Sequence, residues 1–395
     1  MNSFEQLLIL SDKEKKEKGV EYTPKEINQQ PAMWKKTVDI LGNRKDEIYD
    51  FFIKSGLIQS KEVVLILTGA GSSEFIGNSI KNVLRKRLKR EVLSIPTTYL
   101  VTSSVSMFVP HFKYIVISFS RSGNSPESLA TYNNIKKIAP EVKQIIVTCN
   151  NEGDLAKKAR NDKQSLCIIL PEETNDLSLA MTSSFSAMAL TGIGLCFMES
   201  LDKFYSIVER IAYGADRIIK DYGDLLVRFA SKPFSRACFL GSHSLMGTMQ
   251  ECSLKMQEMT EGKVASIFSS YLGLRHGPQV FVNNNCIVIA ALSSDKLVRK
   301  YEMDLLSELK EKNQGFATLI ICNKASEKIS SLSTDVIEIF PYGCAIEDDF
   351  RIMTDVVVGQ ILATFKSIDF GLKPDNPSPI GTINRVVQGV KIYDL

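Results

Sequence analysis

Hydroxyl side chains gather where predicted strands end in the first half of the chain. The segment LTGAGSSEF places Gly71, Ser72 and Ser73 at the end of a strand and the start of a helix. Open α/β sheets bind their ligands at this edge. A dinucleotide site is the rival interpretation, but Glu74 occupies the third glycine position of that motif. A further alternative is that the serines only cap the helix.

The loop after another predicted strand holds more hydroxyl groups than helix capping requires. Its sequence, SFSRSGNSPES, contributes Ser120, Arg121, Ser122 and Ser125. Backbone N–H groups at a helix N-terminus bind an anion, and neighbouring hydroxyls can hold a phosphate without a lysine. A P-loop is excluded because no GK[ST] follows the glycines. We therefore predict a phosphate site here.

A third hydroxyl cluster, AMTSSFS, adds Thr182 and Ser183 at the start of another predicted helix. Taken alone, it is a capping segment. Three such clusters after strands of one sheet converge on one edge, however, and a phosphate needs several donors for its acceptor oxygens. This convergence favours the phosphate site.

A carboxylate pair and a histidine carry the chemistry of the second half. Glu251 and Glu258 lie seven residues apart on a predicted helix and near the same face, and His276 lies in a loop before Gly277. An imidazole titrates near neutrality and suits the opening of a sugar ring, and a carboxylate suits a hydrogen shift between C1 and C2. The alternatives are a solvated helix carboxylate and a structural histidine.

Apolar, β-branched runs alternate with amphipathic stretches, which predicts parallel sheets covered on both faces. We expect an α/β fold of two doubly wound, three-layer units, similar to flavodoxin or Rossmann domains. The predicted strands are 63–69, 92–96, 114–120, 144–150 and 165–171, then 237–242, 286–292, 317–323 and 335–341. The predicted parts are an N-terminal extension at 1–45, domains at 46–204 and 205–371, and a tail at 372–395 that either covers the site or packs on an edge.

Composition excludes several classes of protein. The 395 residues include 48 basic and 45 acidic side chains, so the net charge of +3 gives no field that favours nucleic acid or a membrane surface. Eight scattered cysteines predict reduced thiols and a cytoplasmic location. The three histidines show no ligand spacing, so we expect neither a metal nor a cofactor. No run reaches the roughly 18 apolar residues of a membrane span.

The chain resembles the double sugar-isomerase (SIS) domain proteins, a family that includes glucosamine-6-phosphate synthase. The resemblance covers nearly the whole chain and rests on two α/β units and on the segments GAGSSEF, SFSRSGNSPES, AMTSSFS and LRHGP. The segments EYTPKEINQQPAMW and NPSPIGTINRVVQGV are similar to the AgaS branch of that family. This branch is named tagatose-6-phosphate ketose/aldose isomerase and is assigned as galactosamine-6-phosphate deaminase/isomerase.

The resemblance implies a role for each matching residue. The phosphate is expected to be held by Ser73, Ser120, Ser122, Ser125, Thr182 and Ser183. The family's base matches Glu258, and its ring-opening histidine matches His276. The synthase has a lysine near its C-terminus where this chain has Arg385. Arginine stays protonated and forms no Schiff base, so an electrostatic contact to the substrate is expected instead.

These implications lead to an expected activity. The chain should convert D-galactosamine 6-phosphate to D-tagatose 6-phosphate and ammonia, without a cofactor, as a homodimer or higher homo-oligomer with shared active sites. No glutamine-hydrolysing domain precedes the sugar-binding units, which favours ammonia release over synthesis. The alternatives are glucosamine-6-phosphate deamination, plain aldose–ketose isomerisation of a hexose phosphate, and a sugar-phosphate sensor without catalysis.

Overall fold

A computed structural model of the chain describes residues 1–340, 345–387 and 389–394. Position 341 of the last predicted strand and positions 388 and 395 of the predicted tail lie outside the described residues. The chain divides into two compact units. Unit 1 comprises Met1–Pro31, Leu177–Thr182 and Ile207–Ile380, and unit 2 comprises Ala32–Asp176, Ser183–Ser206 and Gly381–Leu395.

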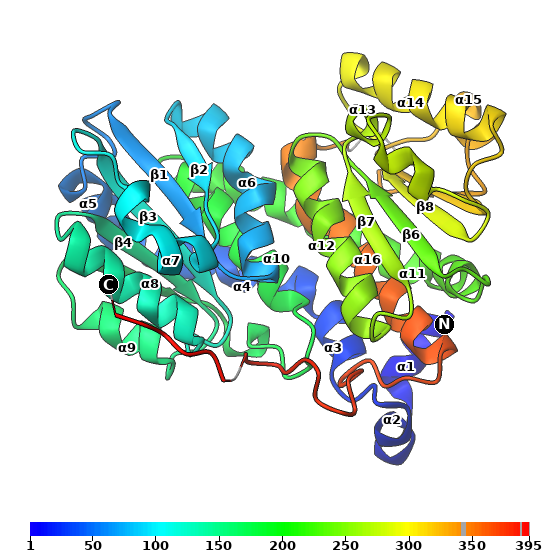
Figure 1. Cartoon of the computed structure of the whole chain (residues 1–395), viewed down its shortest axis with the longest axis horizontal. Helices are drawn as coiled ribbons and strands as arrows, with labels where there is room; N and C mark the ends of the chain where they lie inside the picture. The colour runs from blue at the N-terminus through cyan, green and yellow to red at the C-terminus, as the bar shows by residue number, and fades with distance from the viewer. Residues whose placement is uncertain (341–344, 388, 395) are drawn as a thin grey trace. The chain divides into compact units, whose positions relative to one another are not determined.

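Unit 2 is built on a parallel five-stranded sheet (Figure 1). Its strands are β1 Val63–Thr68, β2 Val92–Ser94, β3 Lys113–Ser120, β4 Lys143–Thr148 and β5 Ser165–Ile169. They lie in the order β2-β1-β3-β4-β5, the flavodoxin-like order. In the interior strand β1 every residue is buried, because helices cover both faces of the sheet and neither face is polar.

Helices cover the two faces of this sheet in separate groups. On one face, Leu100 of α7 and Ile135 of α8 join Val116 of β3 in one apolar cluster, and α9 joins β4 in a second. On the other, α6 and α10 pack together against β1, β3 and β4. The helices are α4 Gln30–Asn43, α5 Lys45–Lys54, α6 Ser72–Leu88, α7 Thr97–Met107, α8 Pro126–Ile138, α9 Asp154–Arg160, η1 Glu172–Thr174, α10 Ser183–Gly194 and η2 Leu195–Phe197.

Unit 1 repeats this topology. Its strands are β6 Arg236–Leu240, β7 Ala265–Ser269, β8 Cys286–Ala291, β9 Ala317–Cys322 and β10 Asp335–Glu338, in the order β10-β9-β8-β6-β7. If these strands are numbered one to five from β6 and the order is read from β7, it is the same as the order in unit 2. The predicted class of two doubly wound parallel sheets is therefore confirmed. Strand β7 was not predicted; it is an edge strand in which Ile267 is half-buried and Phe268 exposed, so it lacks a strong apolar signal.

The helices of unit 1 follow the same division. One face is covered by α13, α14 and α15, whose apolar residues join β6, β8 and β9 in one core. On the other, α12 packs on α16 and contacts β6 and β7. The bounds are α1 Ser3–Ile9, α2 Asp12–Lys18, α3 Thr23–Asn28, α11 Leu201–Ala230, α12 Ser244–Met259, α13 Tyr271–Leu274, η3 Pro278–Phe281, α14 Lys296–Glu311, α15 Glu327–Ser331 and α16 Asp348–Asp369.

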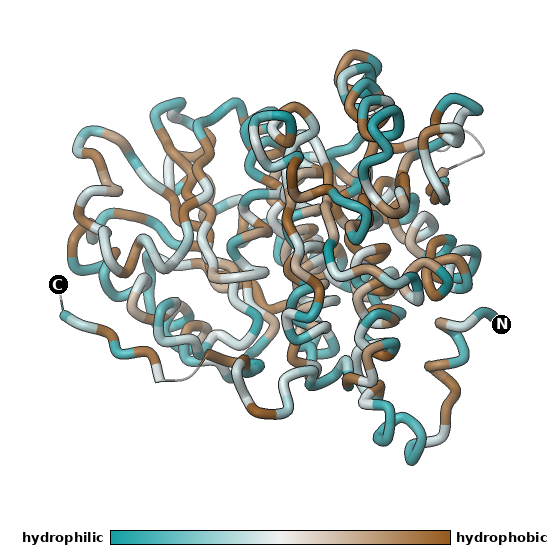
Figure 2. The backbone as a smooth tube through the Cα atoms, turned by 45° about the vertical axis from the view of Figure 1, so that its right-hand side comes forward, coloured by the Kyte–Doolittle hydropathy of each residue, from teal (hydrophilic) through white to brown (hydrophobic). Residues whose placement is uncertain are grey.

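Local signals in the sequence explain where helices begin and end. The helix α2, of sequence DKEKKEK, begins at a capping box of Ser11 and Glu14 and ends at Gly19 in the left-handed conformation. It has no buried residue and forms a hydrophilic turn at the bottom of Figure 2. The carboxylate of Asp375 accepts the N–H groups of Glu21 and Thr23, at 2.6 and 2.7 Å, and so fixes the start of α3.

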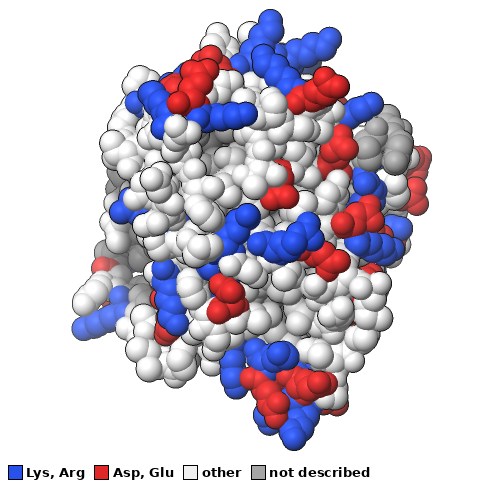
Figure 3. Space-filling model, turned by 90° about the vertical axis from the view of Figure 1, so that its right-hand side faces the viewer, with Lys and Arg blue, Asp and Glu red and all other residues white. Residues whose placement is uncertain are grey.

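The surface carries both signs of charge. On the face drawn in Figure 3, acidic and basic side chains are interspersed. Among the helices that the structure describes, none combines the length and the apolar character needed to cross a membrane.

Candidate active site

The first candidate loop of unit 2 follows β1. A Cβ on Gly69 would lie 2.4 Å from the carbonyl carbon of Ser73, and Gly71, the residue before α6, has φ +56° and ψ −128°. Both positions therefore require glycine, and the chain turns tightly enough to bury Ser72 and Ser73 at the start of the helix. The half-buried carboxyl of Glu74 follows, and burial raises its pKa.

The second candidate loop follows β3, directly beside the first. The register pairs Thr68 of β1 with Ser118 of β3, so the two loops leave the sheet at the same edge. The Ser120 hydroxyl accepts the N–H of Gly123 at 3.1 Å. Ser125 caps α8, where its oxygen accepts the N–H of Ser128 at 3.4 Å.

These contacts stabilise the loop and leave its hydroxyls beside a helix N-terminus. Ser122 and Ser125 are half-buried, and Ser120 is 6% exposed. The predicted residues Ser73, Ser120, Ser122 and Ser125 thus belong to neighbouring loops at the carboxyl edge of one sheet. Their role in binding phosphate stays a prediction.

The third predicted cluster has a different environment. The carboxylate of Asp176 accepts the N–H groups of Ser183 and Ser184, at 3.2 and 2.9 Å, and both hydroxyls. A fixed carboxylate therefore meets the N-terminus of α10, where an anion is stabilised. Thr182 belongs to unit 1 and is fully buried; its carbonyl accepts the Gln360 amide at 3.3 Å. Asp176 was not predicted from the sequence, because it lies seven positions before the helix that it caps.

The predicted tail residue Arg385 is fixed to the same edge of unit 2. Its Nε donates to the carbonyl of Asp176 at 2.7 Å, and its guanidinium also donates to the side chain of Asn175 at 2.7 Å. Arg121, which is 6% exposed, donates to the backbone carbonyl of Arg385. The two arginines therefore hold the tail against the loops that follow β3 and β5.

In unit 1, α12 carries a buried cluster of charges that we call the α12 charge cluster: Glu251, Lys255 and Glu258. The Lys255 ammonium lies 3.1 Å from Glu251 Oε1 and 2.5 Å from Glu258 Oε2. The side chains of Glu251 and Lys255 are fully buried, and that of Glu258 is 23% exposed. Burial disfavours the charged lysine, but the charges of the two carboxylates outweigh burial and raise the pKa of Lys255.

The cluster confirms that Glu251 and Glu258 share a helix face, and it adds Lys255, which was not predicted from the sequence. Lys255 follows Glu251 by four positions and precedes Glu258 by three, the spacings at which helix side chains meet. That spacing could have revealed it. One partly exposed carboxylate held by a buried ammonium is a group that can take a proton from a substrate.

His276 lies apart from this cluster. It follows α13, in an exposed loop that Arg275 fixes by ion pairs to Asp304 and Glu308, at 2.9 and 2.7 Å. In the part of the chain that the structure describes, no hydrogen bond or ion pair joins His276 to Glu258. Glu258 precedes the amino end of β7 and His276 follows its carboxyl end, so a strand of five residues, about 16 Å long, lies between them.

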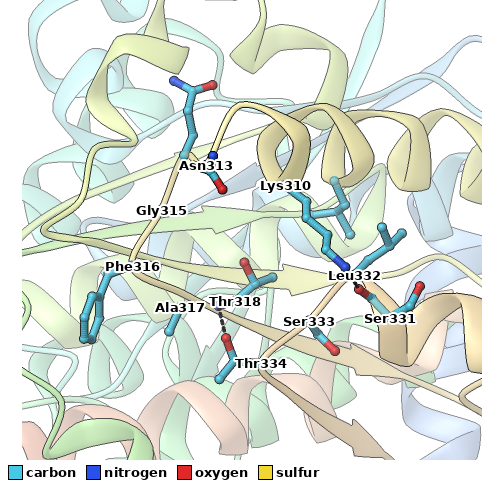
Figure 4. Close-up of a pocket in the computed structure, with 12 residues that line it drawn as sticks. Lys310, Asn313, Gly315, Phe316, Ala317, Thr318, Ser331, Leu332, Ser333 and Thr334 are labelled. Carbon is cyan, nitrogen blue, oxygen red and sulfur yellow. Dashed lines mark hydrogen bonds between the residues drawn. The ribbon is translucent and has the colours of Figure 1, made fainter.

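A hollow at the edge of the unit 1 sheet where the strands begin is not a candidate site. It is lined by Lys310, Phe316 and Thr334, among others, at the amino ends of β9 and β10 (Figure 4). There Lys310 donates to the carbonyl of Ser331 at 2.5 Å, and the N–H of Thr318 to Thr334 at 3.1 Å. Ligands of open α/β sheets bind at the carboxyl ends of the strands instead.

The residues that the structure describes contain no group of His, Cys, Asp and Glu arranged to hold a metal ion.

Two flavodoxin-like units, with hydroxyl-rich loops after β1 and β3, define a protein of the SIS class. The SIS domain family matches residues 57–192. D-galactosamine-6-phosphate deaminase AgaS of Escherichia coli O157:H7 is 32% identical over 375 residues, which are 94% of this chain and 95% of the relative. The protein of that name from Shewanella sp. strain ANA-3 is 33% identical over 393 residues, 98% of this chain and 95% of the relative.

A solved structure agrees. Tagatose-6-phosphate ketose/aldose isomerase from Escherichia coli superposes with a TM-score of 0.85 at 30% identity and covers 94% of this chain and 96% of that chain. The chain therefore belongs to the AgaS family of SIS domain proteins, as the resemblance in sequence predicted.

Proposed function

We propose that this protein is a cytoplasmic amino-sugar-phosphate deaminase and isomerase that converts D-galactosamine 6-phosphate to D-tagatose 6-phosphate and ammonia. The observation that carries the proposal is the α12 charge cluster, which holds one carboxylate, Glu258, at the surface of unit 1. The names of the full-length relatives support the choice of substrate. Net charge near zero and mixed surface charge give no reason to propose nucleic acid as a partner.

Unit 2 binds the phosphate in this proposal. Ser73, Ser120 and Ser122 offer hydroxyls beside the N-termini of α6 and α8, which also favour an anion. Ser125 caps α8, and its hydroxyl donates to Ser128 Oγ at 2.6 Å, so it must turn from Ser128 to donate to the phosphate. Thr182 and Ser183 contribute less, since the Ser183 hydroxyl already donates to Asp176. Gly71 and Ser72 shape the first loop, and Arg121 supports the second.

Unit 1 supplies the proton transfers. His276 moves a proton between O5 and O1 and so opens the ring to an aldehyde. Glu258 removes the proton from C2, which gives an enolamine, and returns a proton to C1. The product is a ketimine at C2. Water then adds to C2, the carbon–nitrogen bond breaks, and ammonia leaves with the ketose phosphate.

Glu258 and His276 act together, in this proposal, across two copies of the chain. Their separation by the length of β7 supports this assignment, because a general acid and base must both reach the reacting atoms. A homodimer with shared active sites satisfies that condition.

Arg385 serves as an electrostatic contact to the substrate or the enediolate-like intermediate. Its bonds to Asn175 and Asp176 support the proposal, because they orient a permanent cation at the ligand edge of unit 2. It also anchors the tail, so its substitution affects binding and order of the tail together.

The experiment that tests this function measures ammonia released from galactosamine 6-phosphate and from glucosamine 6-phosphate by the purified protein. We expect release from the galacto epimer at a higher kcat/KM. Release from the gluco epimer alone would establish glucosamine-6-phosphate deamination, and interconversion of hexose 6-phosphates without ammonia would establish plain isomerisation. Binding of all of these without turnover would identify a sensor.

A further inference from the structure

A cavity of about 430 Å³ opens at the carboxyl edge of the unit 1 sheet. It is lined by Ser242 after β6, by Leu272 after β7, and by Leu297, Tyr301 and Glu302 of α14. In the sheet, β6 lies between β8 and β7, so the order of the strands reverses here, where doubly wound sheets bind ligands. The volume falls within the range of about 300–1,000 Å³ that is common for small-molecule sites. None of the residues assigned above lines it.

Glu302 gives this cavity an unusual chemistry. Its side chain is 1% exposed; Oε2 accepts the N–H of Ser293 at 2.7 Å, and within the described part of the chain no donor meets Oε1 with hydrogen-bond geometry. Burial raises the pKa of this carboxyl to about 7, against a hydrogen bond from the Ser242 hydroxyl, which lowers it. A buried carboxylate oxygen without a donor costs free energy that a ligand can recover.

Arg351 compensates Glu302 only in part: its charge lowers the pKa of this carboxyl, but burial outweighs that effect. Arg351 is committed to Asp355, at 2.6 Å, and to Asp348, at 3.3 Å. Asp348 faces Glu302 as a like charge and raises its pKa further, and Tyr271 faces it as a buried phenol. The start of α12 also opens here, but the Ser244 hydroxyl already donates to Asp349 at 3.3 Å. Two acidic groups, beside one arginine that already pairs with two carboxylates, therefore favour a cation over an anion.

The walls of the cavity are apolar. Leu272, Leu297 and Tyr301 are 46%, 63% and 52% exposed, so their side chains form an unfilled apolar surface. The Ser270 hydroxyl accepts the N–H of Gly273 at 3.0 Å. A polyhydroxylated ligand would find few partners on such walls, whereas a hydrocarbon body with one charged head fits both features.

We infer that this cavity is a second ligand site, which binds a small primary ammonium ion with an apolar body. The ammonium donates to Oε1 of Glu302, and the apolar body packs on Leu297 and Tyr301. The site is separate from the proposed active site: it lies at the beginning of α12, and Glu258 lies 14 residues further along, about 21 Å away. The inference does not depend on the proposed function.

Isothermal titration calorimetry of the full chain with cyclohexylmethylamine at pH 8 tests the inference. The neutral probe cyclohexylmethanol and the anionic probe cyclohexanecarboxylate have the same ring and serve as controls. We expect the amine to bind at least about tenfold more tightly than the alcohol, because a charge-assisted hydrogen bond is added, and the carboxylate not to bind. Equal or tighter binding of the alcohol or the carboxylate, or no heat from the amine at millimolar concentration, would overturn the inference.

Variants of residues on α14 test whether the amine binds at Glu302. Glu302→Gln keeps the shape of the side chain and should lower the affinity for the amine by about tenfold. Glu311 is exposed on the same helix, so Glu311→Gln should leave that affinity unchanged. Amine binding that survives in Glu302→Gln contradicts the assignment. If that variant does not fold, Val298→Trp, which fills the cavity, must abolish binding instead.

The pH dependence gives an independent check. Glu302 must be ionised to bind an ammonium, so lowering the pH from 8 to 6, through a pKa of about 7, should weaken binding about tenfold. His243 also lines the cavity, so the Glu302→Gln variant serves as the control: the part of the pH effect due to Glu302 must vanish in it. A wild-type affinity that does not change with pH argues against the site.

Discussion

At Lys255, one ammonium group faces two carboxylates with no solvent around it. The lysine and Glu251 are fully buried and 3.1 Å apart, so each charge contributes to the compensation of the other. Glu258 extends from this pair toward the surface. The position of the proposed base is thus fixed by an ion pair inside the protein.

The Lys255→Met variant tests that dependence. Methionine fills a similar volume but removes the ammonium that Glu251 and Glu258 face, so the free energy of unfolding should fall by about 3–5 kcal/mol. Urea unfolding measures it, and the double variant Lys255→Met, Glu251→Gln should recover most of the loss. A single variant as stable as the wild type would mean that the cluster does not stabilise unit 1.

Glu302 makes a separate prediction about stability and pH. Its pKa in the folded chain, about 7, lies above its ordinary value of 4.5, so its favourable contribution is complete below about pH 4.5 and is lost as the pH rises through 7. Relative to the wild type, Glu302→Gln should therefore gain about 3 kcal/mol in stability between pH 4.5 and pH 8. Urea unfolding at both pH values gives the difference. A difference that is constant with pH would show that Glu302 titrates normally.

Sequence patterns predicted some of these residues and not others, and the difference has a physical reason. Glu251 and Glu258 were predicted to share a face because helix geometry is local. Glu302 and Asp176 were not predicted, since the burial of one and the capping role of the other arise from contacts between segments distant in sequence.

At the scale of elements, the loops after β1 and β6 have the same conformation but different residues. Gly71 begins α6 with φ +56° and ψ −128°, and His243 begins α12 with φ +52° and ψ −121°. This region suits glycine and strains a residue with a Cβ. The first loop is therefore relaxed, and the second is strained.

Substitutions at these two positions should change the free energy of unfolding in opposite directions. His243→Gly should raise the free energy of unfolding by about 1 kcal/mol, since release of strain exceeds the entropy cost of glycine. Gly71→Ala should lower it by about 1–3 kcal/mol. Both are measured by urea unfolding at one pH. A destabilised His243→Gly variant would mean that contacts of the imidazole outweigh the strain.

The strands show where local patterns suffice. Strands buried on both faces, such as β1 and β8, appear as continuous apolar runs and were predicted. The edge strand β7 has one covered side and mixed burial, so its sequence ASIFS carries no such run.

At the scale of the whole molecule, the proposed assembly makes a quantitative prediction for mixed subunits. If Glu258 acts with His276 of a second copy, a dimer of one Glu258→Gln chain and one His276→Asn chain has one intact site. Random exchange of subunits then restores about one quarter of the wild-type activity, although each variant alone is inactive. Ammonia release after mixing, denaturing and refolding the two variants measures it. Activity that stays at the level of the separate variants would place both residues in one chain's own site.

The Glu258→Gln variant tests the central claim, that this carboxylate moves the proton between C2 and C1, most directly. Ammonia release from galactosamine 6-phosphate and the affinity for that substrate should be measured for the wild type and the variant together. The account predicts an affinity within a few-fold of the wild type and a kcat lower by about 10²–10⁴-fold, because general base catalysis is lost and the serine loops remain. Undiminished turnover in the variant would contradict it.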